Sequence, residues 1–427
     1  MIPRFLFKRS WYFCVIYFLM KNFYDCIIIG GGASGFFFAI NYAERHPEQS
    51  ILIIEKSNRV LQKVKISGGG RCNVTHAEFE PKPLTTHYPR GEKELIGPFH
   101  QFMSGDMMAW LEDKGVNLKI EDDGRIFPVT NDSQTIIDCF INEVNRLGVQ
   151  VKTSENVLSF EYQENIWNIL AKNNTYKAKQ LVISTGSSQK IWVELARLGH
   201  HIIKPVPSLF TFNIDYPTLT ELQGLSLNTH IKLFKDETCK QQLLSSEGAT
   251  LITHWGLSGP CVLKLSAWGA IKLNALNYNC YILINWIFKY SKEDVLSTLK
   301  NFKIDYAKKN ISNRIPFNLP KRFWFFVLKT SKIETQKNWA DLSKKDIQIL
   351  VTLLTAFKLE VKGKSTFKEE FVTAGGVDLK EIDFKTYSSK KQPFLKIIGE
   401  ALNIDAITGG FNFQNAWTSA YVAANNL

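Results

Sequence analysis

Three glycines and one acid near the start of the chain have the spacing of a dinucleotide-binding site. Gly30, Gly32 and Gly35 form the pattern G-x-G-x-x-G. The first glycine allows a tight turn, the second lets backbone N–H groups approach a pyrophosphate, and the third lets a helix pack closely on a strand. Glu55 follows twenty residues after the last glycine. A carboxylate there can accept hydrogen bonds from ribose hydroxyls, which favours FAD or NAD over NADP.

A strand, a turn and a helix must position these residues. Residues 26–29 form an apolar run that predicts a buried parallel strand, and residues 36–45 predict the helix that follows the glycines. A second strand is predicted at residues 51–54, immediately before the acid. The helix N-terminus, with Ala33 and Ser34, would then face the phosphate charge. The sequence therefore predicts an α/β, Rossmann-like domain.

Length, composition and cysteine content are those of a globular protein. The 427 residues are enough for two or three domains, and 45% are hydrophobic while 22% are charged. The seven cysteines are scattered and form no C-x-x-C pair. This distribution argues against a disulfide framework and a zinc site, so we expect no metal and a reducing, cytoplasmic setting.

The first twenty residues form a separate apolar segment. Residues 11–20 are apolar and follow several basic residues, as in a signal peptide, but no small-residue cleavage site follows. The run is also too short to span a bilayer, so we expect no stable membrane insertion. We interpret residues 1–19 as upstream sequence, with translation starting at Met20 rather than Met1. A membrane-associating tail is the alternative.

Positive charge is concentrated in one part of the chain. The net charge is +12, and residues 285–368 contain 18 Lys and Arg against 7 Asp and Glu, a surplus of 11. Such a surplus favours a polyanionic partner, with nucleic acid ahead of a membrane surface. A lysine-rich solvated surface is the alternative. The aromatic residues Phe323 and Trp324, beside Lys321 and Arg322, could stack on bases or belong to a helix core.

A second glycine-rich segment, residues 62–76, has the sequence QKVKISGGGRCNVTH. Its glycines offer converging N–H groups with polar donors directly behind them, as expected of a loop that lies against a cofactor. Together with the first motif, it resembles the YhiN/BaiN-like family of FAD-dependent oxidoreductases, also called aminoacetone-oxidase-family flavoproteins. The resemblance implies that this loop contacts FAD close to the isoalloxazine.

Two later segments extend this resemblance. Residues 399–417, GEALNIDAITGGFNFQNAW, are similar to the family pattern G-E-x-L-D-x-D-G-x-T-G-G-x-N-x-Q-x-A-W, with Asn403 and Ala406 replacing Asp and Gly. A helix N-terminus after the two glycines suits the N1/C2-oxygen edge of a flavin. Ser184-Thr185-Gly186 resembles the A-T-G strand end of two-dinucleotide-type flavoproteins. Together, motif and resemblance place the FAD contacts on Gly30, Gly32, Ala33, Ser34, Gly35, Glu55, Lys56, Lys65, Ser67, Gly69, Arg71, Asn73, Thr185, Gly186, Glu400, Asp405, Gly409, Gly410 and Asn412.

The domain organisation follows from where these motifs stand. We expect a discontinuous FAD domain of the two-dinucleotide type, formed by residues 20–205 and 369–427. Residues 206–368 would be an inserted substrate domain, with a β-rich part to about 285 and a basic helical part after it. Within the FAD domain, residues 99–114 predict one helix, and residues 149–181 predict short antiparallel strands.

Two residues are candidates for acid–base chemistry. Residues 253–260, THWGLSGP, resemble the family pattern T-H-x-G-(I/L)-S-G-P and predict a helix that starts at Pro260 with Ser258 as its cap. His254 would be either a proton donor or a residue that fixes the turn through a backbone hydrogen bond. Cys72 would be either a proton donor or a packed residue of the flavin loop.

The expected function is that of a flavin-dependent reductase. The chain has no second G-x-G-x-x-G, so NADH or NADPH would bind transiently. The resemblance implies hydride reduction of a conjugated C=C bond, either in steroid enones or in ribosomal RNA uridine. The basic insertion favours RNA. A small-molecule reductase or amine oxidase and a non-catalytic flavin-containing RNA-binding protein remain as alternatives, and the sequence does not decide the oligomeric state.

Overall fold

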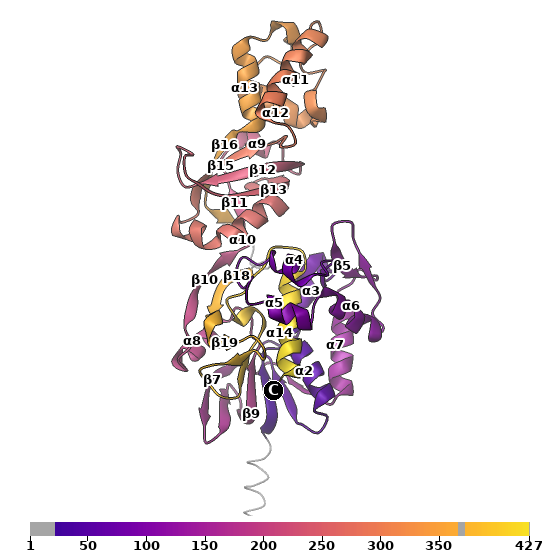
Figure 1. The fold of residues 1–427 in the computed structure, drawn as a ribbon, viewed down its shortest axis with the longest axis vertical. Coiled ribbons are helices and arrows are strands. Elements are labelled where there is room, and N and C mark those ends of the chain that lie inside the picture. Colours follow the sequence, from indigo (N-terminus) through magenta and orange to yellow (C-terminus); the bar gives the residue numbers. More distant parts are fainter. Residues whose placement is uncertain (1–21, 366–371, 427) are drawn as a thin grey trace, which may run out of the picture. The chain divides into compact units, whose positions relative to one another are not determined.

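A computed structural model describes residues 22–365 and 372–426, which fall into two compact units. The first unit combines the chain up to Pro205 with the chain from Thr373 onward, and the second is Val206–Val372 (Figure 1). The second unit is thus inserted into the first. The segment 1–19, the predicted start at Met20 and the predicted boundary at 368/369 lie outside the described residues.

A nine-stranded mixed sheet forms the centre of the first unit. Its parallel strands lie in the order β21-β9-β1-β2-β6. Ile27 of β1 is flanked by Leu52 on β2 and Leu181 on β9, and all three are buried. This arrangement confirms the predicted Rossmann-like α/β class. The nine strands are β1 (Phe23–Ile29), β2 (Ile51–Ile54), β6 (Gln150–Lys152), β7 (Val157–Gln163), β8 (Ile166–Ala171), β9 (Thr175–Ile183), β19 (Ile382–Asp383), β20 (Ser388–Ser389) and β21 (Leu395–Ile397).

Two helices from opposite ends of the chain pack side by side in this unit. They are α2 (Ala33–Arg45) and α14 (Phe411–Asn425), drawn in indigo and yellow in Figure 1. The Phe37 and Trp417 rings are 5.5 Å apart between centroids in an edge-to-face arrangement, which is favourable for aromatic pairs. Both helices begin directly after a glycine turn, so their contact brings the two turns into one unit.

The remaining elements of the first unit include one correction. The single helix predicted at 99–114 is wrong, because the chain forms two helices that are broken at Phe102, which has an extended backbone. Phe102 is buried and stacks on Tyr421 of α14, with ring centroids 4.4 Å apart. The further elements are α3 (Gln62–Gly70), β3 (Thr75–His76), α4 (Pro81–Thr85), α5 (Ile96–Gln101), α6 (Ser104–Asp113), β4 (Leu118–Ile120), β5 (Arg125–Pro128), α7 (Gln134–Arg146), α8 (Gln189–Arg197), η3 (Leu379–Glu381) and η4 (Gly399–Ala401).

The second unit contains a seven-stranded sheet in the order β16-β15-β12-β13-β14-β11-β17. Its central ladder is antiparallel, with Ile231 of β12 opposite Ile284 of β15. The chain enters along β10 (Ile202–Ser208) and returns along β18 (Val372–Val377), which pair with each other. The strands are β11 (Thr211–Asn213), β12 (Ser226–Phe234), β13 (Gln242–Thr253), β14 (Gly256–Ser258), β15 (Asn279–Asn285), β16 (Phe357–Lys362) and β17 (Lys364–Ser365).

Helix α10 (Pro260–Ala275) packs on β13, whereas α11 (Lys292–Asp305), α12 (Lys321–Ser331) and α13 (Lys344–Thr355) gather at one end of the sheet (Figure 1). Phe323 and Trp324 are fully buried there, so they are core residues, the second of their two expected roles, and they are not available to stack on bases. The predicted cap at Ser258 is also wrong, because Ser258 ends β14 and Gly259 precedes the helix. No helix of the described residues is both long and apolar enough to span a membrane. The helices are α9 (Pro217–Thr220), α10 (Pro260–Ala275), α11 (Lys292–Asp305), η1 (Pro316–Asn318), α12 (Lys321–Ser331), η2 (Trp339–Asp341) and α13 (Lys344–Thr355).

Candidate cofactor-binding site

The first glycine turn lies between β1 and α2 and is packed against the end of β9. A Cβ atom on Gly30 would come within 2.5 Å of the Ser184 carbonyl oxygen. A Cβ atom on Gly35 would lie 2.1 Å from the Gly30 carbonyl oxygen and 2.6 Å from Ser184 Oγ. Neither position has room for a side chain. At Gly32, by contrast, a Cβ atom would meet no atom within 4 Å, so the turn leaves open space in front of this glycine.

Ser184, which stands where the A-T-G pattern has alanine, supports this turn directly. Its hydroxyl lies 2.9 Å from the Gly30 carbonyl oxygen and 3.0 Å from that of Ile29, and it can donate to either. The side chain therefore ties the end of β9 to the end of β1.

The N-terminus of α2 has the character of an anion site. No described side chain caps this end of the helix, and its first turn, which includes Ala33 and Ser34, contains no acidic residue. Uncapped N–H groups and the helix dipole attract negative charge. A pyrophosphate in the open space before Gly32 would accept hydrogen bonds from these N–H groups and place its negative charge at the positive end of the dipole.

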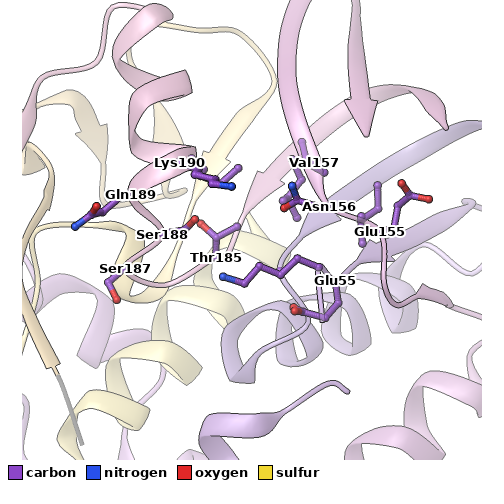
Figure 2. Close-up of a pocket in the computed structure, with 14 residues that line it drawn as sticks. Glu55, Glu155, Asn156, Val157, Thr185, Ser187, Ser188, Gln189 and Lys190 are labelled. Carbon is purple, nitrogen blue, oxygen red and sulfur yellow. The ribbon is translucent and has the colours of Figure 1, made fainter. Parts of the chain in front are cut away.

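Glu55 lies at the end of β2 and faces the same turn. Its carboxylate accepts hydrogen bonds from the Gly31 N–H at 2.8 Å, the Ser57 N–H at 2.9 Å and the Ser57 hydroxyl at 2.8 Å. These bonds hold the side chain at the edge of a cavity of about 300 Å³. Lys56 also lines this cavity. Figure 2 shows Glu55 and Thr185 in it, together with Val157 of β7 and Gln189 and Lys190 of α8.

Three buried polar atoms near the predicted contacts have no hydrogen-bond partner among the described residues. They are Thr185 Oγ1, Asn73 Oδ1 and Asn415 Oδ1. Buried polar groups are almost always paired in folded proteins, and an unpaired one calls for an explanation. Thr185 also lines the cavity beside Glu55, so a bound polar group there would complete its pairing.

The second glycine segment leaves helical geometry at its C-terminal end. Ser67 has an extended ψ of 151°, and Gly68 and Gly69 have left-handed φ values of 57° and 69°. A Cβ atom on Gly68 would lie 2.8 Å from the Asn73 backbone nitrogen, whereas one on Gly69 or Gly70 would meet no atom within 4 Å. The last two glycines thus present open backbone, which suits a planar ring system lying against them.

Several predicted contact residues have partners within the protein. Arg71 pairs with Glu121 at 2.6 Å and covers the Phe127 ring at 3.9 Å, while Lys65 Nζ lies 3.1 Å from the Gln134 side-chain oxygen. Both cationic groups are therefore already engaged with other side chains of the protein. Cys72 is fully buried, and burial raises the pKa of its thiol to about 12. Its environment is that of a packed residue, the second of its two expected roles.

The carboxylates of the C-terminal motif are also paired. Asp405 forms a bidentate ion pair with Arg90 and is fully buried. Glu400 pairs with Lys63 at 2.5 Å, and its Oε2 lies 3.3 Å from where a Cβ atom on Gly186 would stand. Glu400 and Gly186 are thus neighbours, as the FAD assignment requires, whereas Asp405 is engaged in the core.

The second glycine turn leads into α14. The Asn412 side chain accepts from the Ala406 N–H at 3.0 Å and donates to its carbonyl at 3.1 Å, which fixes the loop before the helix. A Cβ atom on Gly410 would overlap the Thr75 backbone at 2.6 Å. The N-terminus of α14, like that of α2, has no side-chain cap among the described residues and no acid in its first turn.

Two histidines beside this turn were not predicted from the sequence. His76 Nδ1 lies 3.1 Å from the Gly409 carbonyl oxygen. His87 stacks on Phe411, the first residue of α14, with ring centroids 4.1 Å apart. His76 stands only three residues after Asn73 of the glycine segment. This proximity in the sequence could have identified His76 as a residue of the site. His87 had no such signal, because only the fold brings it to α14.

His254 lies in the other unit, on the turn between β13 and β14. Its side chain is exposed and its ring contacts Trp255, with centroids 4.2 Å apart. Within the residues that the structure describes, the ring forms no hydrogen bond, so the turn-fixing bond expected as its alternative role is not present there.

The chain matches the family described as the HI0933-like protein Rossmann domain over residues 24–426. It belongs to this family. The membership confirms the resemblance inferred from the motifs, and the family is one of FAD-dependent oxidoreductases with a Rossmann-like FAD-binding fold. The match covers both parts of the first unit and the inserted unit.

Named relatives of this HI0933-like protein align over nearly their whole length. The chain is 27% identical over 415 residues to the ribosomal RNA dihydrouridine synthase of Escherichia coli, covering 95% of this chain and 98% of the relative. It is 26% identical over 422 residues to the Haemophilus influenzae protein of the same name, covering 96% and 99%. It is 23% identical over 406 residues to the 3-dehydro-bile acid delta(4,6)-reductase of Clostridium scindens, covering 93% and 97%.

The residues of the first unit fit FAD. The open space before Gly32 and the uncapped α2 N-terminus suit its pyrophosphate, and the Glu55 carboxylate beside this turn suits the hydroxyls of its adenosine ribose. The open backbone of Gly69 and the uncapped α14 N-terminus suit the flavin end. The unit thus offers one anion-attracting helix end to the pyrophosphate and another to the flavin edge where negative charge gathers on reduction.

Proposed function

We propose that this protein is an FAD-dependent reductase of the cytoplasm that converts uridine in ribosomal RNA to dihydrouridine. The observation that carries this proposal is the charge of the inserted unit. Of the 18 Lys and Arg residues between 285 and 368, ion pairs in the described part of this region involve only Lys329, Lys337, Lys358 and Lys362. Most of the positive charge is therefore not neutralised within the unit.

Unneutralised charge of this kind suits a polyphosphate substrate. When Lys and Arg side chains neutralise the phosphates of a nucleic acid, the counterions condensed on the nucleic acid are released. This release supplies much of the free energy of binding. A small apolar substrate would gain nothing from it. The two relatives named as ribosomal RNA dihydrouridine synthases support the same substrate, because they align with the insertion as well as with the Rossmann-like unit.

The chemistry would combine a bound flavin with groups of the protein. When bound, FAD supplies a hydride for the β-carbon of the α,β-unsaturated carbonyl. The N-terminus of α14 would stabilise the negative charge that gathers on the N1/C2-oxygen edge on reduction. The α2 N-terminus and Glu55 would hold the distant pyrophosphate and ribose. NADH or NADPH would be the electron donor, bound transiently because the chain has one G-x-G-x-x-G.

His254 is our proposed proton donor to the α-carbon. Its side chain is exposed, whereas the Cys72 thiol is buried with a pKa raised to about 12, too high to release a proton readily near neutrality. Replacing His254 with glutamine is expected to slow the transfer from reduced enzyme to RNA by about 100-fold or more, the usual contribution of a general acid. Flavin reduction by NADH or NADPH should keep its wild-type rate in this variant.

Stopped-flow absorbance separates these two half-reactions, and Cys72→Ser serves as the matched control. Equal loss of both half-reactions in His254→Gln would indicate a folding defect, which the flavin content of the purified variant would reveal. Unchanged transfer to RNA would remove His254 from the mechanism.

The proposed substrate is tested by deleting the gene and mapping dihydrouridine in ribosomal RNA. Loss of dihydrouridine at a defined site, restored by the wild-type gene, is the expected result. Unchanged modification would eliminate the RNA substrate. The second candidate, a small-molecule enone reductase, is favoured by the bile-acid reductase relative and predicts that the purified protein oxidises NADH or NADPH with a steroid enone but not with RNA.

A non-catalytic flavin-containing RNA-binding protein predicts a different result. In that case RNA binding would be sensitive to salt, yet anaerobic NADH and NADPH would leave the flavin oxidised. Bleaching of the flavin absorbance by either nucleotide, followed by its return on addition of unmodified ribosomal RNA, distinguishes the reductase from this alternative.

A further inference from the structure

The helical part of the inserted unit carries an open groove of about 690 Å³. One wall is the exposed side of α12, and the other consists of the segment before β12 together with the residues that follow α12. Volumes of this order hold nucleotide-sized ligands, since ligand sites span about 300–1,000 Å³. The groove is lined by Glu221, Leu222, Lys321, Arg322, Phe325, Phe326, Lys329, Ile333, Glu334 and Thr335.

Phe325 differs from the other aromatic residues of α12. Phe323, Trp324 and Phe326 are buried in the core of the inserted unit. Phe325 is only partly buried and lines the groove, which makes it available to a ligand. Leu222 and Ile333 add buried apolar surface beside it. The groove therefore offers one accessible aromatic ring beside buried apolar side chains.

The charged residues of the groove differ in whether they are paired within the protein. Lys329 pairs with Glu221 at 2.8 Å, and Arg322 donates to the Glu221 carbonyl oxygen at 2.8 Å. These contacts hold the opposite wall in place. Lys321 has no ion pair within the described residues, and its Nζ lies 5.8 Å from the centroid of the Phe325 ring. A free cation thus stands beside the accessible ring, with Glu334 as the remaining acid.

We propose that this groove binds one unpaired nucleotide of an RNA, with its base stacked on Phe325 and its phosphate near Lys321. An aromatic face beside a cation is the arrangement by which proteins hold single-stranded nucleic acid, because every base has a stacking face and every linkage a charge. The positive surplus of residues 285–368 favours RNA over a protein segment as the occupant. The inference rests on the proposed RNA substrate and specifies where the inserted unit binds this RNA.

The test measures binding of a fluorescein-labelled, unmodified single-stranded ribosomal RNA fragment to the flavin-containing protein by fluorescence anisotropy. Phe325→Ala is expected to weaken binding by about tenfold or more, the usual effect of losing one stacked base. Phe325→Trp should retain wild-type affinity. Lys321→Gln should reduce the magnitude of the slope of log affinity against log salt concentration by about 1, the value expected for the loss of one phosphate contact. Tyr290→Ala removes an exposed aromatic side chain elsewhere in the unit and should change nothing.

The outcomes separate this inference from the proposed function. Wild-type protein that binds no RNA would overturn the RNA substrate and the groove together. Wild-type binding that survives both Phe325→Ala and Lys321→Gln would overturn the groove alone. Unchanged RNA affinity with a switch from dimer to monomer in Phe325→Ala, seen by sedimentation velocity, would identify the groove as a self-association surface instead. Melting temperature and flavin content, compared with the Phe325→Trp protein, show that the alanine variant is folded.

Discussion

Replacing Asp405 with alanine is expected to lower the free energy of unfolding of the Rossmann-like unit by roughly 3–5 kcal/mol, the usual cost of breaking a buried ion pair from one side. Asp405 is fully buried, and the side chain of its partner Arg90 is only 11% exposed. Removing the carboxylate would leave the guanidinium charge desolvated without a counterion. The pair joins the segment before α5 to the loop before α14, so the loss would loosen the turn that leads to Gly409 and Gly410.

Urea unfolding followed by tryptophan fluorescence measures this effect. Glu221→Gln is the matched control, because it breaks the Lys329–Glu221 pair, whose side chains are more than half exposed, and should cost less than about 1 kcal/mol. The double variant Asp405→Leu with Arg90→Met should recover much of the loss, since neither charge then remains buried. A stable Asp405→Ala protein that had lost only its flavin would contradict this account and support a direct ribityl contact.

Local signals in the sequence were sufficient for the cofactor turn and the central strands. The roles of Gly30, Gly32 and Gly35 depend on one turn and on the strands beside it, and buried parallel strands have an apolar composition that needs no distant information. The helix predicted at 99–114 failed for the opposite reason. Its break at Phe102 depends on stacking against Tyr421 and on the Thr418 hydroxyl, which donates to the Phe102 carbonyl at 2.9 Å.

Side-chain partners of the candidate site could not be predicted, because they join distant parts of the chain. The fold brings Glu400 to Lys63, which is 337 residues away in the sequence, and Asp405 to Arg90, which is 315 residues away. The sequence pattern predicts these acids as cofactor contacts and gives no reason to expect cations opposite them. His87 reaches the start of α14 for the same reason. The residue types at the site were thus predictable, while their pairing was a property of the fold.

The second and third glycines of the first motif are expected to respond to alanine in different ways. At Gly35 the new Cβ atom would stand 2.1 Å from the Gly30 carbonyl oxygen, so the backbone of α2 or of the turn must move. We expect Gly35→Ala to destabilise the protein by several kcal/mol, as overpacking against a rigid backbone does. At Gly32 the Cβ atom would meet nothing within 4 Å, and the backbone φ of −94° is accessible to alanine.

Gly32→Ala should therefore leave the melting temperature of the apoprotein unchanged. It should weaken FAD binding by at least tenfold, because the new methyl group would occupy the space in which the pyrophosphate approaches the N–H groups of α2. Apoprotein prepared by removal of the flavin, its thermal unfolding, and titration with FAD followed by flavin fluorescence measure both quantities. Gly31→Ala is a less suitable control, since its Cβ atom would lie 3.0 Å from the Glu55 side chain. If Gly32→Ala bound FAD with wild-type affinity, the cofactor would not lie against this turn, and Glu55 would lose its assignment to the ribose as well.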